Sequence, residues 1–353
     1  MALLSASCQQ VPTDSMLIVG TYTDTSSQGI YAFNYNQKTY DSELLNTIYD
    51  ENPSFLNIDF KTGQMLSVKE NGAKTAALMS YKLDTKTGAM TKTAETLTQG
   101  AHSCHVSRYG QTAYVANYTG GTLSVLNLDE EGKVLDLAMQ VPGETFKADP
   151  VREATPHVHC SMVEPDHKHL LFSDFSADRL ARVELDGKGM PIASTIQYAS
   201  LSPSTGVRHI TLSNDGRLAY VIGELSEAVG VIELSSMKVL QEIQAHEKLG
   251  RQAGDIHLTP NGKFLYASIR NMDDGIAIFK VGKDGLLEKT GYQTTGTHPR
   301  NFTINPSGTI LLCACRDSDS IETYAIDQKT GALTLIPEAT ISVPHPVYVQ
   351  FSK

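Results

Sequence analysis

Histidine, arginine and carboxylate side chains recur at two fixed places in a pattern that repeats along the chain. The first place is the start of the apolar segment that opens each repeat, and it holds His105, His159, Arg208, His209, Asp255, His257, His298, Arg300 and His345. The second is the end of the next apolar segment, and it holds Glu70, Asn117, Asp174, Glu224, Arg270 and Arg316. If the repeats surround an axis, these side chains meet on one face, where they can bind an anion and transfer protons.

The arginines indicate a ligand most directly. We expect Arg208 and Arg270 to face a central channel, where a guanidinium needs an anion and its planar fork suits carboxylate or phosphate. Structural roles remain open for five other side chains: loop hydrogen bonds for His105, His257 and His345, and ion pairs with arginine for Glu70 and Asp174.

Two short motifs have the spacing of a metal-ligand pair. These are HVH at 157–159 and HKH at 167–169. An H-x-H pair in a strand puts both imidazoles on one face, but HKH is expected in a turn at the wrong end of its strand. No third ligand has a convincing spacing, so the sequence predicts no metal site. It also has no GxSxG, HExxH or P-loop, and no GxGxxG that opens a helix after a strand. We therefore expect no cofactor.

The element that positions these side chains is an apolar segment, a polar turn and a second apolar segment. It occurs six times, at 57–71, 105–118, 160–175, 210–225, 256–271 and 302–317. The turn glycines Gly63, Gly110, Gly216, Gly262 and Gly308 are 47, then 106 over two repeats, then 46 and 46 residues apart. A period near 46–53 with hairpin turns such as NDG and PNG suits the four-stranded blades of a β-propeller.

The two ends of the chain supply a further blade. The segment HPVYVQF at 345–351 resembles the first strand of a repeat, and the segment at 17–36 resembles the later strands. The sequence therefore predicts an all-β, seven-bladed propeller closed by N- and C-terminal strands that share one blade. We expect one domain at 16–353, preceded by a tail or signal remnant at 1–15.

The charge and apolar content limit the partners. Of 353 residues, 39 are acidic and 29 basic, which gives a net charge of −10 and disfavours nucleic acid or an anionic membrane as the main partner. No apolar run approaches the ~20 residues that span a bilayer. The five cysteines form no CxxC pair, so we expect buried thiols. The start, MALLSASCQQ, resembles the end of a bacterial lipoprotein signal with its cysteine at Cys8.

Three segments carry a resemblance to a known family. STGVRHITLSNDGRLAYVIGEL (204–225), GDIHLTPNGKFLYASIR (254–270) and THPRNFTINPSG (297–308) resemble the propeller-type 6-phosphogluconolactonases, a family that also contains carboxy-cis,cis-muconate cyclases. The similarity covers residues 16–353. It implies a catalytic group of His159, Arg208, Glu224 and Arg270, with Arg300 as an alternative to Arg270. The residues expected to contact substrate are His105, Asn117, Asp174, His209, His257 and Arg300.

The resemblance implies hydrolysis of 6-phosphogluconolactone to 6-phosphogluconate, a step of the pentose phosphate pathway. Its partner would be a small anionic sugar lactone, and its compartment the cytoplasm. A base must activate water and a donor must stabilise the oxyanion. We assign these roles to Glu224 and His159, and the reverse assignment stays open. Arg208 and Arg270 would bind the phosphate, and the insertion at 143–156 could cap the mouth of the channel.

Two other functions remain open. The same site could act on another lactone or carry out a muconate-type reaction, or the propeller could bind a partner without catalysis, because a fold does not fix a function. A lipoprotein anchored through Cys8 would belong in the bacterial envelope. The oligomeric state is also left open by the sequence.

Overall fold

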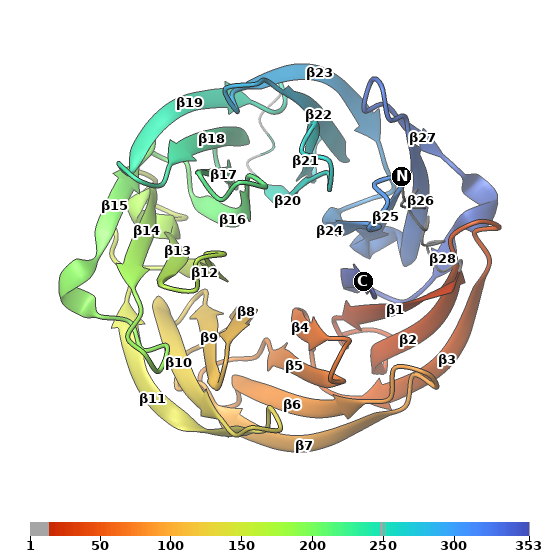
Figure 1. Ribbon diagram of the computed structural model, residues 1–353, viewed down its shortest axis with the longest axis horizontal. Coiled ribbons are helices and arrows are strands. Elements are labelled where there is room, and N and C mark those ends of the chain that lie inside the picture. The colour runs from red at the N-terminus through yellow and green to blue at the C-terminus, as the bar shows by residue number, and fades with distance from the viewer. Residues whose placement is uncertain (1–13, 248–249, 251, 353) are drawn as a thin grey trace, which may run out of the picture.

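Seven antiparallel sheets surround a central channel in the computed structural model, which describes residues 14–247, 250 and 252–352 (Figure 1). The innermost strands are β4 (Leu56–Asp59), β8 (Ser103–Tyr109), β12 (Val158–Val163), β16 (Val207–Leu212), β20 (Ala253–Leu258), β24 (Pro299–Ile304) and β29 (Pro346–Phe351). The second strands are β1 (Asp14–Thr21), β5 (Gln64–Lys69), β9 (Thr112–Asn117), β13 (His169–Asp174), β17 (Leu218–Gly223), β21 (Phe264–Ile269) and β25 (Ile310–Cys315).

The outer half of each blade is built from two further strands. The third strands are β2 (Gly29–Asn36), β6 (Ala77–Leu83), β10 (Thr122–Leu128), β14 (Arg179–Glu184), β18 (Ala228–Glu233), β22 (Gly275–Val281) and β26 (Ser320–Ile326). The outermost strands are β3 (Ser42–Tyr49), β7 (Met90–Leu97), β11 (Val134–Pro142), β15 (Gln197–Ser200), β19 (Lys238–Gln244), β23 (Leu287–Thr294), β27 (Leu333–Leu335) and the short β28 (Ile341–Ser342). Short 3₁₀ turns lie at η1 (Phe175–Ala177), η2 (Ala193–Thr195), η3 (Arg316–Ser318) and η4 (Pro337–Ala339).

The ring closes as the sequence predicts. β29 pairs antiparallel with β1, with Leu17 opposite Phe351 and Val19 opposite Val349. One blade therefore has its innermost strand from the C-terminus and its other three from the N-terminus, and this leaves no open edge between the first and last blades. No helix among the described residues is long and apolar enough to cross a membrane.

Within each blade, solvent exposure increases from the inner strands to the outermost strand. The second strand, such as LAYVIG of β17, is buried at every position because blades pack on both of its faces. The outermost strand, such as KVLQEIQ of β19, alternates exposed and half-buried residues. Between the first two strands, Gly216 and Gly262 turn the chain at φ of 68° and 69°, a conformation that a side chain disfavours. This explains the recurring NDG and PNG turns.

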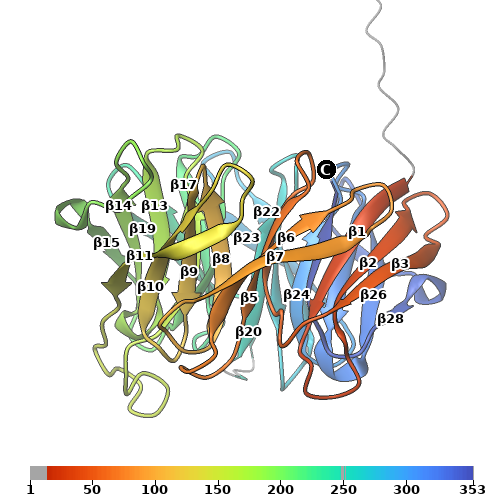
Figure 2. The same cartoon turned by 90° about the horizontal axis from the view of Figure 1, so that it is seen from below.

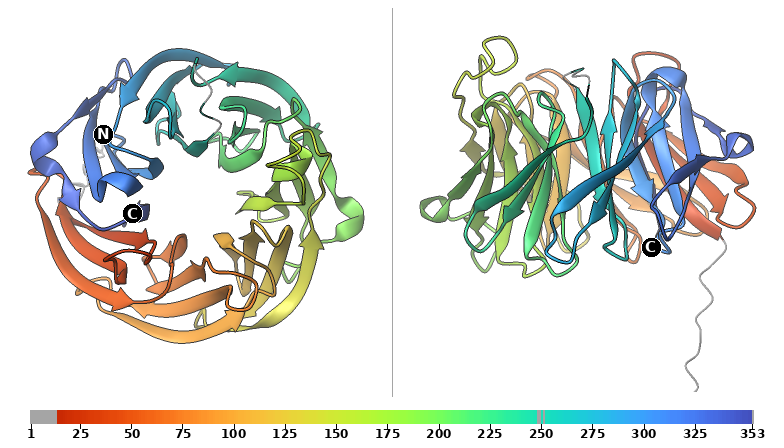
Figure 3. Two further views of the ribbon diagram at one scale, coloured as in Figure 1. Left: turned by 180° about the vertical axis from the view of Figure 1, so that it is seen from behind. Right: turned by 90° about the horizontal axis from the view of Figure 1, so that it is seen from above.

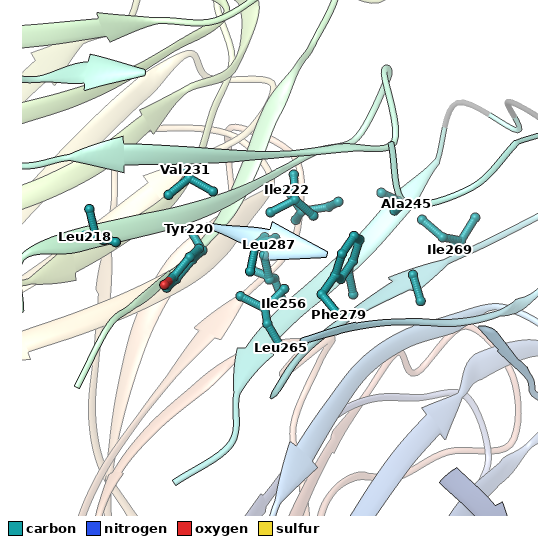
Figure 4. Close-up of a cluster of buried hydrophobic side chains, with 14 residues drawn as sticks. Leu218, Tyr220, Ile222, Val231, Ala245, Ile256, Leu265, Ile269, Phe279 and Leu287 are labelled. Carbon is teal, nitrogen blue, oxygen red and sulfur yellow. The ribbon is translucent and has the colours of Figure 1, made fainter. Parts of the chain in front are cut away.

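Neighbouring blades are joined by apolar clusters and by buried tyrosines. One cluster packs Leu218 and Tyr220 of one blade against Ile256 and Phe279 of the next (Figure 4). The buried Tyr220 hydroxyl donates 3.0 Å to the Gly285 carbonyl of the next blade. Tyr114 and Tyr266 make the same bond to Gly189 and Gly331. A buried hydroxyl needs a partner, so these bonds fix how one blade sits on the next.

The cysteines of the described chain are free. Cys104, Cys160, Cys313 and Cys315 are all buried thiols, as the sequence predicts. Cys8 and residues 1–13 of the expected tail or signal remnant lie outside the described residues. The last two residues of that expected segment, Asp14 and Ser15, instead begin β1.

The channel has two mouths. All innermost strands run in the same direction, so we call the end where they begin the N-mouth and the end where they finish the C-mouth. The chain terminus after β29 lies at the C-mouth, whereas the yellow-green loop at 143–156 projects from the opposite face (Figures 2 and 3). The insertion predicted from the sequence thus stands beside the N-mouth.

Candidate active site

The chemistry at the N-mouth is centred on Glu224, which directly follows β17. Its Oε2 accepts a hydrogen bond of 2.9 Å from Arg208 Nε and lies 3.3 Å from Arg270 Nη2. Its Oε1 lies 2.5 Å from Nη2 of Arg152, which the 143–156 loop supplies. One buried carboxylate is thus held by three guanidinium groups from three parts of the chain.

Arg208 and Arg270 are fixed by backbone as well as by Glu224. Arg208 Nη1 donates to the Gly254 carbonyl at 2.7 Å. Arg270 donates from Nε to the Gln252 carbonyl at 2.9 Å and from Nη2 to the Ala253 carbonyl at 2.7 Å. Their side chains are only 2% and 3% exposed. These two arginines therefore serve first to hold the carboxylate, and they do not face open water.

Arg152 is placed differently. Its side chain is 33% exposed, and among the described residues its other hydrogen bond is to the Tyr118 hydroxyl at 3.4 Å. The loop that carries it is anchored by two backbone donors, Phe146 N to the Ser176 carbonyl and Glu144 N to the Asp174 carboxylate, both at 3.0 Å. The insertion thus brings a partly exposed cation over the site.

The three arginines decide the protonation state of Glu224. Burial alone would raise the pKa of this carboxyl, but Arg270, Arg208 and Arg152 together lower it from 4.5 to about 2. Glu224 is therefore a carboxylate throughout the physiological pH range. With all three cations in place it is a weak base, because a proton acceptor works best when its pKa is near the working pH.

His159 stands beside this cluster on β12. Its ring contacts Tyr118 at a centroid distance of 5.5 Å and His209 at 5.2 Å. Among the described residues, its buried Nδ1 has no hydrogen-bond partner. Burial, and then the nearby charge of Arg208, hold the pKa of His159 well below 6.5. The imidazole is neutral at pH 7, so it can donate one hydrogen bond and accept another but carries no charge.

A second ion cluster adjoins the first. Arg300 of β24 donates from Nη2 to the Tyr22 hydroxyl at 2.5 Å, and its Nη2 lies 3.8 Å from Glu70. The Tyr22 hydroxyl in turn donates 2.9 Å to Glu70. Arg270, and not Arg300, is the arginine that binds Glu224; Arg300 supplies a separate cation at the same mouth.

A different set of predicted residues gathers around Asp255. Its carboxylate binds His209 Nδ1 at 2.7 Å, His257 Nε2 at 2.8 Å and Asn301 Nδ2 at 2.5 Å. His105, His209 and His257 line a funnel of about 790 Å³ that opens at the C-mouth. The expectation that all these polar residues meet on one face is therefore wrong: they divide between the two mouths.

The pleat of the innermost strands explains the division. The second residues of β12, β16 and β24 are His159, Arg208 and Arg300, which belong to the N-mouth. The third residues of β12, β16, β20 and β24 are Cys160, His209, Asp255 and Asn301, which line the C-mouth funnel. One step of about 3.3 Å along a strand moves a side chain from one layer to the next.

The same one-residue effect separates Asn117 and Asp174 from the site. They are the last residues of β9 and β13, whereas Glu224 is the first residue after β17. Asn117 bonds Ser103, Thr122 and Ser124 within its own blade. Asp174 pairs with Arg179 at 2.8 Å, which is the structural ion pair left open above. The structure does not bring either residue to Glu224.

The sequence reasoning missed three residues of the N-mouth: Tyr22, Tyr118 and Arg152. A signal existed for two of them. The residues that directly follow the second strands are Tyr22, Glu70, Tyr118, Phe175, Glu224, Arg270 and Arg316. A strict alignment of the repeats would have selected Tyr118 in place of Asn117. Arg152 has no such signal, because it lies in an insertion outside the repeat.

Three side chains that could hold a metal ion lie on the turn after β12 and at the start of β13. Ligand atoms of Glu164, Asp166 and His169 are within 4.8 Å of one another. Both Glu164 oxygens already accept hydrogen bonds from Arg182, at 2.6 and 3.0 Å. His169 comes from the HKH motif, whereas His157 of the HVH motif bonds the Ser176 hydroxyl at 2.8 Å.

Comparison with known proteins agrees with this architecture. The family profile described as "Lactonase, 7-bladed beta-propeller" matches residues 16–351. Proteins named 6-phosphogluconolactonase from Formosa agariphila and Bacillus subtilis are each 30% identical, over 92% and 94% of this chain and 96% and 97% of theirs. The structure of the Pseudomonas aeruginosa periplasmic gluconolactonase superposes with a TM-score of 0.89 at 27% identity, over 96% of this chain and 99% of that one.

Proposed function

Because the chain belongs to the lactonase family of seven-bladed β-propellers, we propose that it hydrolyses 6-phosphogluconolactone to 6-phosphogluconate at the N-mouth. The names of the Formosa agariphila and Bacillus subtilis relatives support this substrate. The observation that carries the proposal is the buried Glu224 carboxylate among arginines, with the neutral His159 in the same mouth.

Lactone hydrolysis needs few catalytic groups. Water attacks the carbonyl carbon, the ring C–O bond breaks, the ring oxygen takes a proton, and a carboxylate and a proton are released. Glu224 accepts the proton of the attacking water. A neutral His159 donates a hydrogen bond to the oxyanion; its depressed pKa disfavours an imidazolium acid. Such a base contributes roughly 10²–10⁴-fold and such a donor roughly 10²–10³-fold, which suffices for a lactone that also opens spontaneously.

The anionic group of the substrate needs cations that are free to bind it. Arg152 and Arg300 are more exposed than Arg208 and Arg270, with 33% and 16% of their side chains accessible. They provide a local positive charge on a chain whose net charge is −10. At short range, charge-assisted hydrogen bonds outweigh the repulsion of distant, screened charges.

A second candidate substrate is the lactone without phosphate. Arg208 and Arg270 already have protein partners, so the number of cations left for a phosphate is smaller than the sequence suggests. The name of the Pseudomonas aeruginosa relative, gluconolactonase, supports this alternative.

Proton release distinguishes the two substrates. The purified protein is added to freshly prepared 6-phosphogluconolactone, and separately to glucono-1,5-lactone, in weak buffer, and the spontaneous rate is subtracted. We expect faster proton release with both and a higher kcat/KM for the phosphorylated lactone. If neither rate exceeds the spontaneous one, the proposal is wrong.

A further inference from the structure

The three arginines on Glu224 do not bind it in the same way. Arg208 and Arg270 share Oε2, are almost fully buried, and are tied to backbone carbonyls. Arg152 alone binds Oε1 and is one-third exposed, and Tyr118 is the only further hydrogen-bond partner of its side chain in the described part of the protein. Of the three arginines, Arg152 is therefore the one whose ion pair with Glu224 is most easily exchanged for another.

Departure of Arg152 would change the chemistry of the carboxylate. Oε2 would remain held by two fixed guanidinium groups, and Oε1 would become free to accept a proton from water. Loss of one of three neighbouring cations also raises the proton affinity of the carboxylate. The group that is a weak base when capped would become a better one when uncapped.

An anionic substrate supplies the reason for Arg152 to move. We propose that Arg152 is the specificity residue of this site: it caps Oε1 of Glu224 in the free protein and transfers to the anionic group of the substrate, which uncovers Oε1 as the base. The inference rests on the lactonase function proposed above. A phosphate offers two charges and three acceptor oxygens, whereas Glu224 offers Arg152 one oxygen of a carboxylate that two other arginines also bind, so the exchange is favourable. A lactone without an anionic group leaves the cap in place.

The loop holds the backbone of Arg152 in place over the site, while the guanidinium end of its side chain can move. Glu153, the next residue, is fully buried, and its Oε2 accepts a hydrogen bond of 2.6 Å from Asp149 N. The Thr145 hydroxyl donates to the Glu153 carbonyl. The backbone around Arg152 is therefore anchored, and only the long side chain needs to swing.

The test compares Arg152→Gln with Lys147→Gln. Lys147 is an exposed cation of the same loop, so its variant controls for the lost charge and for any effect on loop folding. For Arg152→Gln we expect kcat/KM to fall about tenfold or more with 6-phosphogluconolactone, mainly through KM. With glucono-1,5-lactone we expect an unchanged or higher kcat/KM, because Oε1 is no longer capped. Lys147→Gln should match the wild type on both.

Equal losses on both lactones, or no change on either, would overturn the inference. Calorimetric titration separates it from the proposed function, because binding needs no turnover. The wild type should bind 6-phosphogluconate about tenfold or more tightly than gluconate, and Arg152→Gln should remove this preference. If the wild type binds both equally, the inference fails whatever the catalytic result. If the preference is present without turnover, only the lactonase function fails.

Discussion

Two buried carboxylates, Glu224 and Asp255, lie in one channel and differ in the groups that hold them. Glu224 is held by three charged side chains, one of them partly exposed. Asp255 is held by His209, His257, Asn301 and the backbone N–H groups of Ile256 and Phe302. Burial opposes ionisation of both, and their partners lower the pKa of both below the usual range.

The difference in partners indicates a difference in role. The donors to Asp255 come from β16, β20 and β24, and Asn301 Oδ1 accepts a further bond of 2.8 Å from Val349 N of β29. This network joins the innermost strands of four successive blades, including the closing one. Asp255 is thus a fixed point of the ring, whereas Glu224 has one partner that can be exchanged. In this channel, burial and a low pKa are found both in Asp255, to which we assign a structural role, and in Glu224, which we propose to be catalytic. The mobility of the partners is therefore the more informative feature.

The largest expected effect on stability is at the fixed point. Asp255→Asn keeps the shape but turns one acceptor into a donor that faces other donors. We expect the free energy of unfolding, measured in urea, to fall by about 3–5 kcal/mol. Asp284→Asn, on an exposed turn, is the matched control and should change it little. A stable Asp255→Asn protein would break the comparison.

The next largest effect on stability is expected at Arg270, which from the sequence would bind the phosphate of the substrate. Because it is buried and tied to Gln252 and Ala253, Arg270→Ala should lower the free energy of unfolding by about 2–3 kcal/mol as well as impair turnover. Arg316→Ala, at the equivalent position of the next blade, should cost much less because Arg316 is half-buried and pairs with Asp317. Wild-type stability of Arg270→Ala would show that this side chain is free to bind substrate.

The smallest effect is a pH dependence of the loop that carries Arg152. Burial, together with Asp178 and Asp149, raises the pKa of Glu153 from 4.5 to about 7. Since the folded protein keeps this proton while the unfolded chain loses it, stability should fall as pH rises from about 4.5 to 7. Glu153→Gln cannot ionise and should flatten this dependence in thermal unfolding curves. If the variant kept the pH dependence of the wild type, Glu153 would not be its cause.

The fold could be predicted from the sequence because its signal is repeated. Six copies of the turn between the first two strands gave the period, and the partial repeats at 17–36 and 345–351 gave the closure. Of the site, Glu224, His159, Arg208 and Arg270 follow from repeat position and from family resemblance. The division of the polar residues between the two mouths could not be predicted from the sequence, because neighbours in the chain such as Arg208 and His209 belong to different layers of the channel. A shift of one residue likewise selected Asn117 in place of Tyr118. Arg152 lies outside the repeat, where periodicity carries no information.

The comparison of the two carboxylates is tested most directly by kcat. Glu224→Gln and Asp255→Asn are assayed together by proton release from 6-phosphogluconolactone, at a temperature where circular dichroism shows both variants folded. We expect kcat to fall about 10²-fold or more in Glu224→Gln and to stay within about threefold of the wild type in Asp255→Asn. A near-normal kcat in Glu224→Gln together with a large loss in Asp255→Asn would contradict it and place the catalytic site at the C-mouth.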